Sequence, residues 1–321
     1  MNIYNLGPKK IILVYHSFCE KYSSVPDAHL RRKGAVPVDL LESHLNWLSH
    51  FADFVSLGEI VRPSSSRGWK VAVTLDDGYR NNIALGLPVF EEFEVPVTWF
   101  VNTEFVESDD LPWWDLVAFM TRVAQPTLAI EDRDDRYVFD LSEIYDRECF
   151  RAHCKTWFQK ESPETANRIR HQIEQGIPGD LPRNAFASRS EVVEASQSRW
   201  LQIGGHTVSH PNLALLSDDD ARREIIQGKE QLEKWTSQPV KWFAYPYGGR
   251  EHWNERTKQI VYEAGFRGAV TTIRAYADQR TDRFEIPRLT VPNTQPWKMK
   301  AWVLATNASR ELYRVKQNWV A

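Results

Sequence analysis

Residues 71–78 read Val-Ala-Val-Thr-Leu-Asp-Asp-Gly. The apolar and β-branched run Val71–Leu75 predicts a buried strand, and Gly78 suits a tight turn after it. Two adjacent carboxylates, Asp76 and Asp77, therefore follow the end of a strand, where parallel barrels carry their active sites. Adjacent side chains point in different directions, so one carboxylate can bind a metal ion while the other faces a water molecule. Capping of a following helix is the structural alternative for the pair.

A second polar fragment, His206-Thr207-Val208-Ser209-His210, follows another short apolar run. Its two imidazoles are four residues apart, so one turn of helix or a compact loop brings both to one metal ion. Two histidines and one carboxylate form a facial ligand set that leaves coordination positions open for water and substrate. Partly exposed loop histidines without a ligand are the alternative.

Strand and helix patterns alternate along most of the chain. About seven strand–helix repeats predict a parallel sheet with helical crossovers and favour a barrel. We expect strands at 10–15, 70–75, 96–101, 200–203, 241–244, 268–270 and 286–290, and helices at 38–51, 82–92, 218–235, 253–264 and 297–315.

Residues 107–195 interrupt this alternation. They are charged and mainly helical in pattern, with one probable hairpin that joins residues 128–130 to 137–139. Because both ends re-enter the α/β pattern, we expect an insertion or lid on a single domain that spans residues 1–321. Trp113 and Trp114, near the start of the insertion, could bring an aromatic platform to the cleft.

Composition excludes several classes of function. The 321 residues are 42% hydrophobic and 26% charged, with a formal net charge of -3. That balance gives no electrostatic case for binding nucleic acid or an anionic membrane surface. We find no apolar run long enough to span a bilayer and no export signal, so we expect a cytoplasmic protein. Three cysteines at no metal-binding spacing indicate free thiols.

A third fragment, Phe243-Ala244-Tyr245-Pro246-Tyr247-Gly248, also ends a predicted strand. Pro246 and Gly248 would fix a rigid loop whose backbone N–H groups could face a developing oxyanion. A plain structural turn is the alternative.

In this order and strand context, the three fragments resemble the motifs of the polysaccharide deacetylases of carbohydrate esterase family four, the NodB-homology domain. That family shows Thr-Phe-Asp-Asp-Gly, His-(Ser/Thr)-x-x-His and Arg-x-x-Pro-Tyr, and this chain reads TLDDG, HTVSH and FAYPY. The resemblance covers residues from about 10 to 105 and from 198 to 290. It implies a distorted (β/α) barrel of about seven strands, and it leaves the insertion unexplained.

The resemblance also implies roles for individual residues. Asp77, His206 and His210 would hold a divalent metal ion, with zinc favoured over cobalt, nickel and manganese. Asp76 would be the general base, and the backbone near Tyr247 and Pro246 would stabilise the oxyanion.

The implied activity is removal of N- or O-acetyl groups from a sugar or glycan precursor, in cell-surface polysaccharide biosynthesis. Two alternatives stay open. One is a deformylase or other amide hydrolase that uses the same scaffold, and the other is a catalytically inactive glycan-binding protein.

Two departures from the family pattern motivate further candidates. The arginine that begins the third motif is replaced by Phe243, and Arg288 at the end of a late strand is the best substitute, with an ordinary surface ion pair as its alternative. No histidine follows residue 252, where the family supplies its general acid. We expect His16, at the end of the first strand, to take that role, unless it is a plain loop histidine. Metal-bound water or Tyr247 could also donate the proton.

Overall fold

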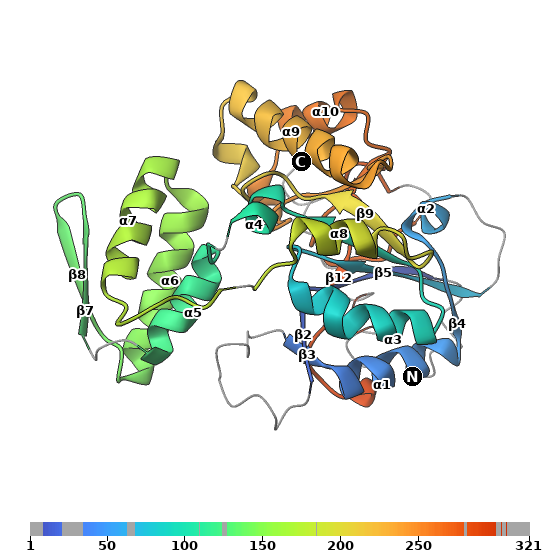
Figure 1. The fold of residues 1–321 in the computed structure, drawn as a ribbon, viewed down its shortest axis with the longest axis horizontal. Helices are drawn as coiled ribbons and strands as arrows, with labels where there is room; N and C mark the ends of the chain where they lie inside the picture. Colours follow the sequence, from blue (N-terminus) through green and yellow to red (C-terminus); the bar gives the residue numbers. More distant parts are fainter. Residues whose placement is uncertain are drawn as a thin grey trace, which may run out of the picture.

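The computed structural model describes residues 9–20, 35–62, 68–108, 110–123, 127–183, 185–278, 281–299, 303 and 306. Its main body is an eight-stranded sheet wrapped by helices (Figure 1). Seven strands follow one another in parallel, and an eighth, β4 (Ala52–Phe54), pairs with the beginning of β5. Along the path, the strands are β11 (Gly268–Val270), β10 (Trp242–Ala244), β9 (Leu201–Gly205), β6 (Val97–Val101), β5 (Trp69–Leu75), β1 (Lys10–Tyr15) and β12 (Leu289–Thr290).

Residues 286–290 close this path into a barrel. Ile286 forms a parallel bridge with Val270 of β11, and its backbone N–H donates to the Ala269 carbonyl oxygen at 2.9 Å. Only three residues later, Leu289 pairs with Leu13 of β1. One short segment therefore joins the two ends of the strand path, and the predicted distorted (β/α) barrel is confirmed.

The strands read as continuous apolar runs because both of their faces are buried. Ile11–Val14 of β1 and Val71–Val73 of β5 are almost fully excluded from solvent. Parallel sheets covered by helices on the outside have this pattern. The covering helices are α1 (Val38–Ser49), α2 (Leu57–Ile60), α3 (Leu87–Glu92), α8 (Arg189–Ala195), α9 (Asp218–Thr236) and α10 (Glu255–Glu263).

Several local features differ from the sequence-based expectation. The helix expected at 82–92 begins with a π-helical turn, η2 (Asn82–Gly86), before α3, and the helix expected from residue 253 begins at Glu255. The short parallel pair β2 (Ser17–Cys19) and β3 (Ala35–Pro37) was not expected. The last predicted helix, 297–315, lies mostly outside the described residues. In the part that the structure describes, residues 296–299, 303 and 306 are helical. The remaining short elements are α4 (Thr103–Glu107), η3 (Leu213–Leu215) and η4 (Arg250–His252).

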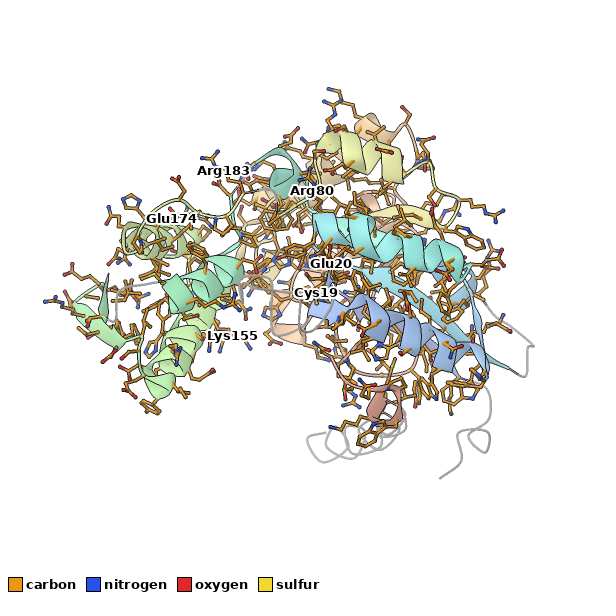
Figure 2. The ribbon with its side chains drawn as sticks, turned by 60° about the horizontal axis from the view of Figure 1, so that its bottom comes forward. Cys19, Glu20, Arg80, Lys155, Glu174 and Arg183 are labelled. Carbon is orange, nitrogen blue, oxygen red and sulfur yellow. The ribbon has the colours of Figure 1, made fainter. Side chains whose placement is uncertain are left out.

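Although α8 packs on the barrel core through Val192 and Ala195, most of the predicted insertion, 107–195, forms a helical lobe beside the barrel (Figure 1). It contains α5 (Trp113–Val123), α6 (Ile144–Lys160), α7 (Pro163–Gln175) and the predicted hairpin, β7 (Thr127–Asp132) with β8 (Asp135–Asp140). These elements share a hydrophobic core separate from that of the barrel, which includes Met120, Ile130, Phe150, Trp157 and Ile169. In Figure 2, Lys155 and Glu174 mark this insertion, and Arg80 and Cys19 mark the barrel. The role of the insertion as a lid stays a prediction.

Among the helices of the described residues, none combines the length and the apolar character that crossing a membrane would require. The three cysteines carry thiols rather than disulfides.

Candidate metal centre

Asp76 and Asp77 stand at the mouth of the barrel, directly after β5. The Asp76 backbone N–H donates to the Tyr15 carbonyl oxygen at 3.1 Å, which extends the pairing of β5 with β1 by one residue. Asp77 and Gly78 then adopt left-handed backbone, with φ of 76° and 87°. Aspartate and glycine are among the residues that tolerate this region. The turn directs the two carboxylates differently, as the sequence predicted.

Asp77, His206 and His210 meet in the interior at the ends of β5 and β9. Oδ1 of Asp77 lies 3.5 Å from Nε2 of His206 and 3.5 Å from Nε2 of His210. One ligand atom from each residue lies within 4.8 Å of the others, and all three side chains are buried. The structure therefore brings the predicted ligand set together around a space that one cation could share.

The surroundings of the two imidazoles suit a metal ion. Nδ1 of His206 lies 2.7 Å from the Ala244 carbonyl oxygen, so this nitrogen carries the proton and Nε2 keeps its lone pair toward Asp77. Burial, with help from the nearby His206, lowers the pKa of His210 to about 3. A neutral imidazole is the form that binds a divalent metal. The donor set of this site fits such an ion.

The loop between the two histidines is compact and non-helical, with left-handed backbone at Thr207 and His210. Glu224 of α9 holds it. The carboxylate of Glu224 accepts the backbone N–H of Val208 and of Ser209, both at 2.9 Å, and the Ser209 hydroxyl at 2.7 Å. One turn further along α9, a Cβ atom on Gly228 would lie 3.0 Å from the Thr207 carbonyl carbon. The glycine thus lets the helix backbone approach the loop closely.

Arg288 and Asp76 form a buried pair beside the triad. The two Nη atoms of Arg288 donate to the two carboxylate oxygens of Asp76, both at 2.7 Å. Arg288 also donates through Nη1 to the Thr74 hydroxyl and through Nε to the Thr271 carbonyl oxygen, each at 3.0 Å. Its side chain is fully buried, which excludes the alternative of an ordinary surface ion pair.

The charge of Asp76 depends on this arginine. Burial by itself would raise the pKa of Asp76, but the Arg288 charge and hydrogen bonds outweigh it, with smaller contributions from His206 and His16. The pKa of Asp76 is therefore held below its usual value, and the carboxylate is anionic at neutral pH. The structure thus provides a charged, oriented carboxylate next to the three candidate metal ligands.

His16 and Tyr247 lie on two sides of this centre. His16 follows β1, is half-buried, and is near enough to Asp76 to affect the pKa of that carboxyl group. The Tyr247 ring packs edge-on against the His210 ring, with centroids 4.6 Å apart. Its backbone is left-handed, and the Pro246 carbonyl oxygen accepts the Gly248 N–H at 2.6 Å, so the loop is tightly turned.

The start of the insertion contacts the candidate metal centre at Tyr247 and His210. Trp113 donates its indole N–H to the Tyr247 hydroxyl at 3.0 Å. Trp114 lies 4.7 Å from the His210 ring and donates to the Tyr79 hydroxyl, which in turn donates to Asp115. The sequence pointed to the tryptophan pair but missed the contributions of Tyr79 and Glu224. Neither residue carries a recognisable signal, since a tyrosine after a turn and a glutamate on an amphipathic helix are common.

The chain is similar to known proteins in sequence and in fold. A family model described as polysaccharide deacetylase matches residues 65–269. A peptidoglycan-N-acetylglucosamine deacetylase of Bacillus cereus is 44% identical over 46 residues, which span 14% of this chain and only 17% of that protein.

Two solved structures have a similar fold over most of their length. The Streptococcus pyogenes deacetylase PplD in complex with acetate has a TM-score of 0.56 at 18% identity, covering 91% of this chain and 97% of that chain. A de-N-acetylase from Aggregatibacter actinomycetemcomitans has a TM-score of 0.58 at 15% identity, covering 91% of this chain and 99% of that chain. At such low identity the likeness demonstrates the fold alone.

Proposed function

This chain belongs to the polysaccharide deacetylase family, and from that premise we propose that it is a metal-dependent hydrolase that removes N- or O-acetyl groups from a sugar or glycan precursor. The observation that carries the proposal is the pairing of two features in one buried centre. These are the Asp77–His206–His210 cluster and the anionic Asp76 held by Arg288. A binding protein would have no need of an oriented base beside a metal site. Synthesis of a cell-surface polysaccharide is the setting that such an activity favours.

We propose Asp77, His206 and His210 as the ligands of a divalent metal ion, with zinc the first candidate. When bound, such an ion supplies Lewis-acid chemistry, because it increases the acidity of water and polarises a carbonyl group. Asp76 accepts the proton of the attacking water, and Arg288 fixes the orientation of its carboxylate.

Two further groups act on the developing charges. The Tyr247 backbone N–H, in the tight turn that begins at Pro246, donates to the oxyanion formed from the acetyl carbonyl. His16, on the Asp76 side of the centre, donates a proton to the departing amine or alkoxide.

The test begins with the metal content of protein purified without added metal. We expect about one divalent ion per chain, lost in His206→Ala and retained in Asp76→Asn. Acetate release from acetylated sugars should fall by about 10²-fold or more in Asp76→Asn. If the wild type takes up neither zinc nor cobalt, the proposed mechanism is wrong.

The same sugar panel separates the alternatives. N-acetylglucosamine derivatives come first, because the Bacillus cereus relative is named for that sugar. Formate release from N-formyl sugars without acetate release would favour a deformylase. Sugar binding without release of either acid would favour a binding protein.

A further inference from the structure

The hairpin of the insertion has one covered edge and one open edge. Figure 1 shows β7 and β8 on the side of the insertion that is away from the barrel. The outer edge of β7 is covered by α7. There the Glu131 N–H donates to the Gln172 side chain at 2.8 Å, and the Glu131 carbonyl oxygen accepts from Arg168 at 3.0 Å and from Gln172 at 2.9 Å. Among the described residues β8 pairs only with β7, so this small sheet ends at β8.

The register of the hairpin shows which backbone groups of β8 point outward. In an antiparallel pair, facing residues alternate between those that exchange hydrogen bonds and those that turn their N–H and C=O groups away from each other. Glu131 and Asp140 are of the second kind, because their N–H groups donate to side chains outside the hairpin. By alternation, Arg136, Val138 and Asp140 all direct backbone groups to the open edge. For those of Arg136 and Val138, the described part of the chain provides no partner.

The side chains along this edge are exposed and partly apolar. Arg136, Val138 and Asp140 lie on one face of β8, since alternate residues of a strand share a face, and Val138 is 56% exposed. The bond from the Asp140 N–H to the first turn of α6 brings that turn to the same edge. Ile144 and Tyr145 of this turn are 72% and 78% exposed. Apolar surface beside free backbone groups favours pairing with another strand.

The open edge of β8 is complementary to a second copy of itself. When two copies lie antiparallel about a twofold axis at Val138, the two valines face each other and can exchange both backbone hydrogen bonds. Arg136 of each copy then lies opposite Asp140 of the other, because each is two residues from the axis. Opposite charges in directly facing positions stabilise a strand pair.

We propose that the protein forms a symmetric dimer through β8, in which two hairpins join into one four-stranded antiparallel sheet. The order of the edge, with a basic residue before the valine and an acidic one after it, favours a second copy over a strand of another protein. Only two residues of the edge have free backbone groups, so the interface is small. We expect a reversible dimer with a dissociation constant on the order of 10–100 μM.

The experiment reverses the charges of the edge in the 321-residue chain. Arg136→Asp places two like-charged pairs across the axis, and so does Asp140→Arg. Each variant alone should self-associate about ten-fold more weakly than the wild type in analytical ultracentrifugation. An equimolar mixture should recover the wild-type affinity, because a mixed dimer again has two pairs of opposite charge. Asp140→Arg also loses its hydrogen bonds to Ser142, but mixing would not repair that loss.

Two further variants make the test specific. Val138→Pro removes the N–H at the axis, and the hairpin should tolerate it, since proline is accommodated on edge strands where the N–H faces solvent. This variant should be monomeric. Lys155→Asp is the matched control, because it reverses a charge at an exposed position of α6 near His252 of the barrel, and it should dimerise as the wild type does. Thermal unfolding shows whether each variant is folded.

Three outcomes would overturn the proposal. A wild type that stays monomeric up to about 500 μM would leave the open edge to a strand of another protein. Dimers that persist in Val138→Pro would place the contact elsewhere on the molecule. A mixture of the two charge variants that associates no better than either alone would exclude the antiparallel register about Val138.

Discussion

Arg288 holds a carboxylate that is distant from it in the sequence. The third family motif has phenylalanine in place of arginine in this chain, and the guanidinium of Arg288 reaches Asp76 from 212 positions away. Both partners are buried, so the two-point contact is protected from solvent screening. The orientation of the Asp76 carboxylate is therefore set by the fold and not by the position of the arginine in the sequence.

We predict that Arg288→Lys lowers kcat for acetate release by about ten-fold to a hundred-fold, because an ammonium group cannot bind both carboxylate oxygens in one plane. Metal content should not change, since Arg288 contacts none of the three candidate ligands in the described structure. Stopped assays of acetate and metal analysis of the same preparation check this. A variant with normal kcat would show that Asp76 needs no partner.

Glu224 is a second single residue with a structural effect on the centre. Three hydrogen bonds to its carboxylate hold the loop that carries His206 and His210. We predict that Glu224→Ala weakens zinc affinity by about ten-fold to a hundred-fold, as loss of a group that supports metal ligands commonly does. Competition with a chromogenic chelator measures this. Glu230→Ala, at an exposed position of the same helix, is the control, and equal zinc affinity in the two variants would count against the role of Glu224.

The residues of the candidate metal centre could be predicted from sequence, whereas the residue that holds their loop could not. Asp77, His206 and His210 stand in short motifs at predicted strand ends, and chemistry restricts which residue types can serve there. Glu224 lies on the polar face of a charged helix. From the sequence alone, a carboxylate there is expected to face solvent, so its contacts with the loop are not predicted. Only the approach of α9 to the loop reveals its function.

At the scale of elements, the insertion depends on a few polar contacts as well as on its separate core. Asp132 at the end of β7 accepts the Trp157 indole N–H at 3.0 Å and an Arg168 Nη2 proton at 2.7 Å. The carboxylate thus connects the hairpin to both α6 and α7. The hydrogen bond from Arg168 is the main cause that holds the pKa of Asp132 below its usual value.

We predict that Asp132→Asn destabilises the insertion by about 1–3 kcal/mol, the usual cost of weakening charged hydrogen bonds. Because the folded-state pKa is lowered, this contribution is fully present above the unfolded pKa of about 4 and is lost as the pH falls through the lower folded value. Hydrogen exchange of α6 and α7 at pH 7 and pH 3 measures both effects. If the wild type and Asp132→Asn differ as much at pH 3 as at pH 7, the assignment is wrong.

Most strands were predicted well, including the three-residue β10 and β11, whereas β2, β3 and β4 were not expected. The apolar runs of β1, β5 and β6 and the hairpin of the insertion lie within a residue or two of the expected positions. The three-residue strands β2, β3 and β4 are too short for any periodicity to show. The π-helical turn at Asn82–Gly86 depends on packing around Asn82, which accepts the Trp99 indole N–H and donates to the His16 carbonyl oxygen.

At the scale of the whole molecule, the candidate metal centre joins parts of the chain that are distant in sequence. Its ligands follow β5 and β9, which are separated in the sheet by β6. A metal ion bound only by the folded state must therefore stabilise the whole barrel. The gain is about 4 kcal/mol when free zinc is a thousand times its dissociation constant.

We predict that zinc raises the midpoint of thermal unfolding of the wild type and has no effect on His210→Ala. Scanning calorimetry with zinc and with an added chelator checks this, with His171→Ala, at an exposed position of the insertion, as the control. An equal rise in the wild type and His210→Ala would place the zinc elsewhere.

The sequence predicted a barrel with a last strand at 286–290, but not which strands this segment joins. Closure depends on one bridge from Ile286 to Val270 and on the pairing of the two-residue strand β12 with β1. A cavity of about 450 Å³ beside His210 is also hidden from the sequence, because its walls come from elements separated by more than a hundred residues. Long-range placement of this kind is set by packing and not by local preference.

The closing segment, residues 286–290, also sets the order in which a newly made chain becomes able to react. Asp77, His206 and His210 have all left the ribosome well before Arg288 appears. A growing chain can thus possess its complete metal-binding set while its barrel is open and Asp76 has no partner. A product cut short before residue 286 would keep all three candidate ligands but lose both the closing segment and the arginine that orients Asp76.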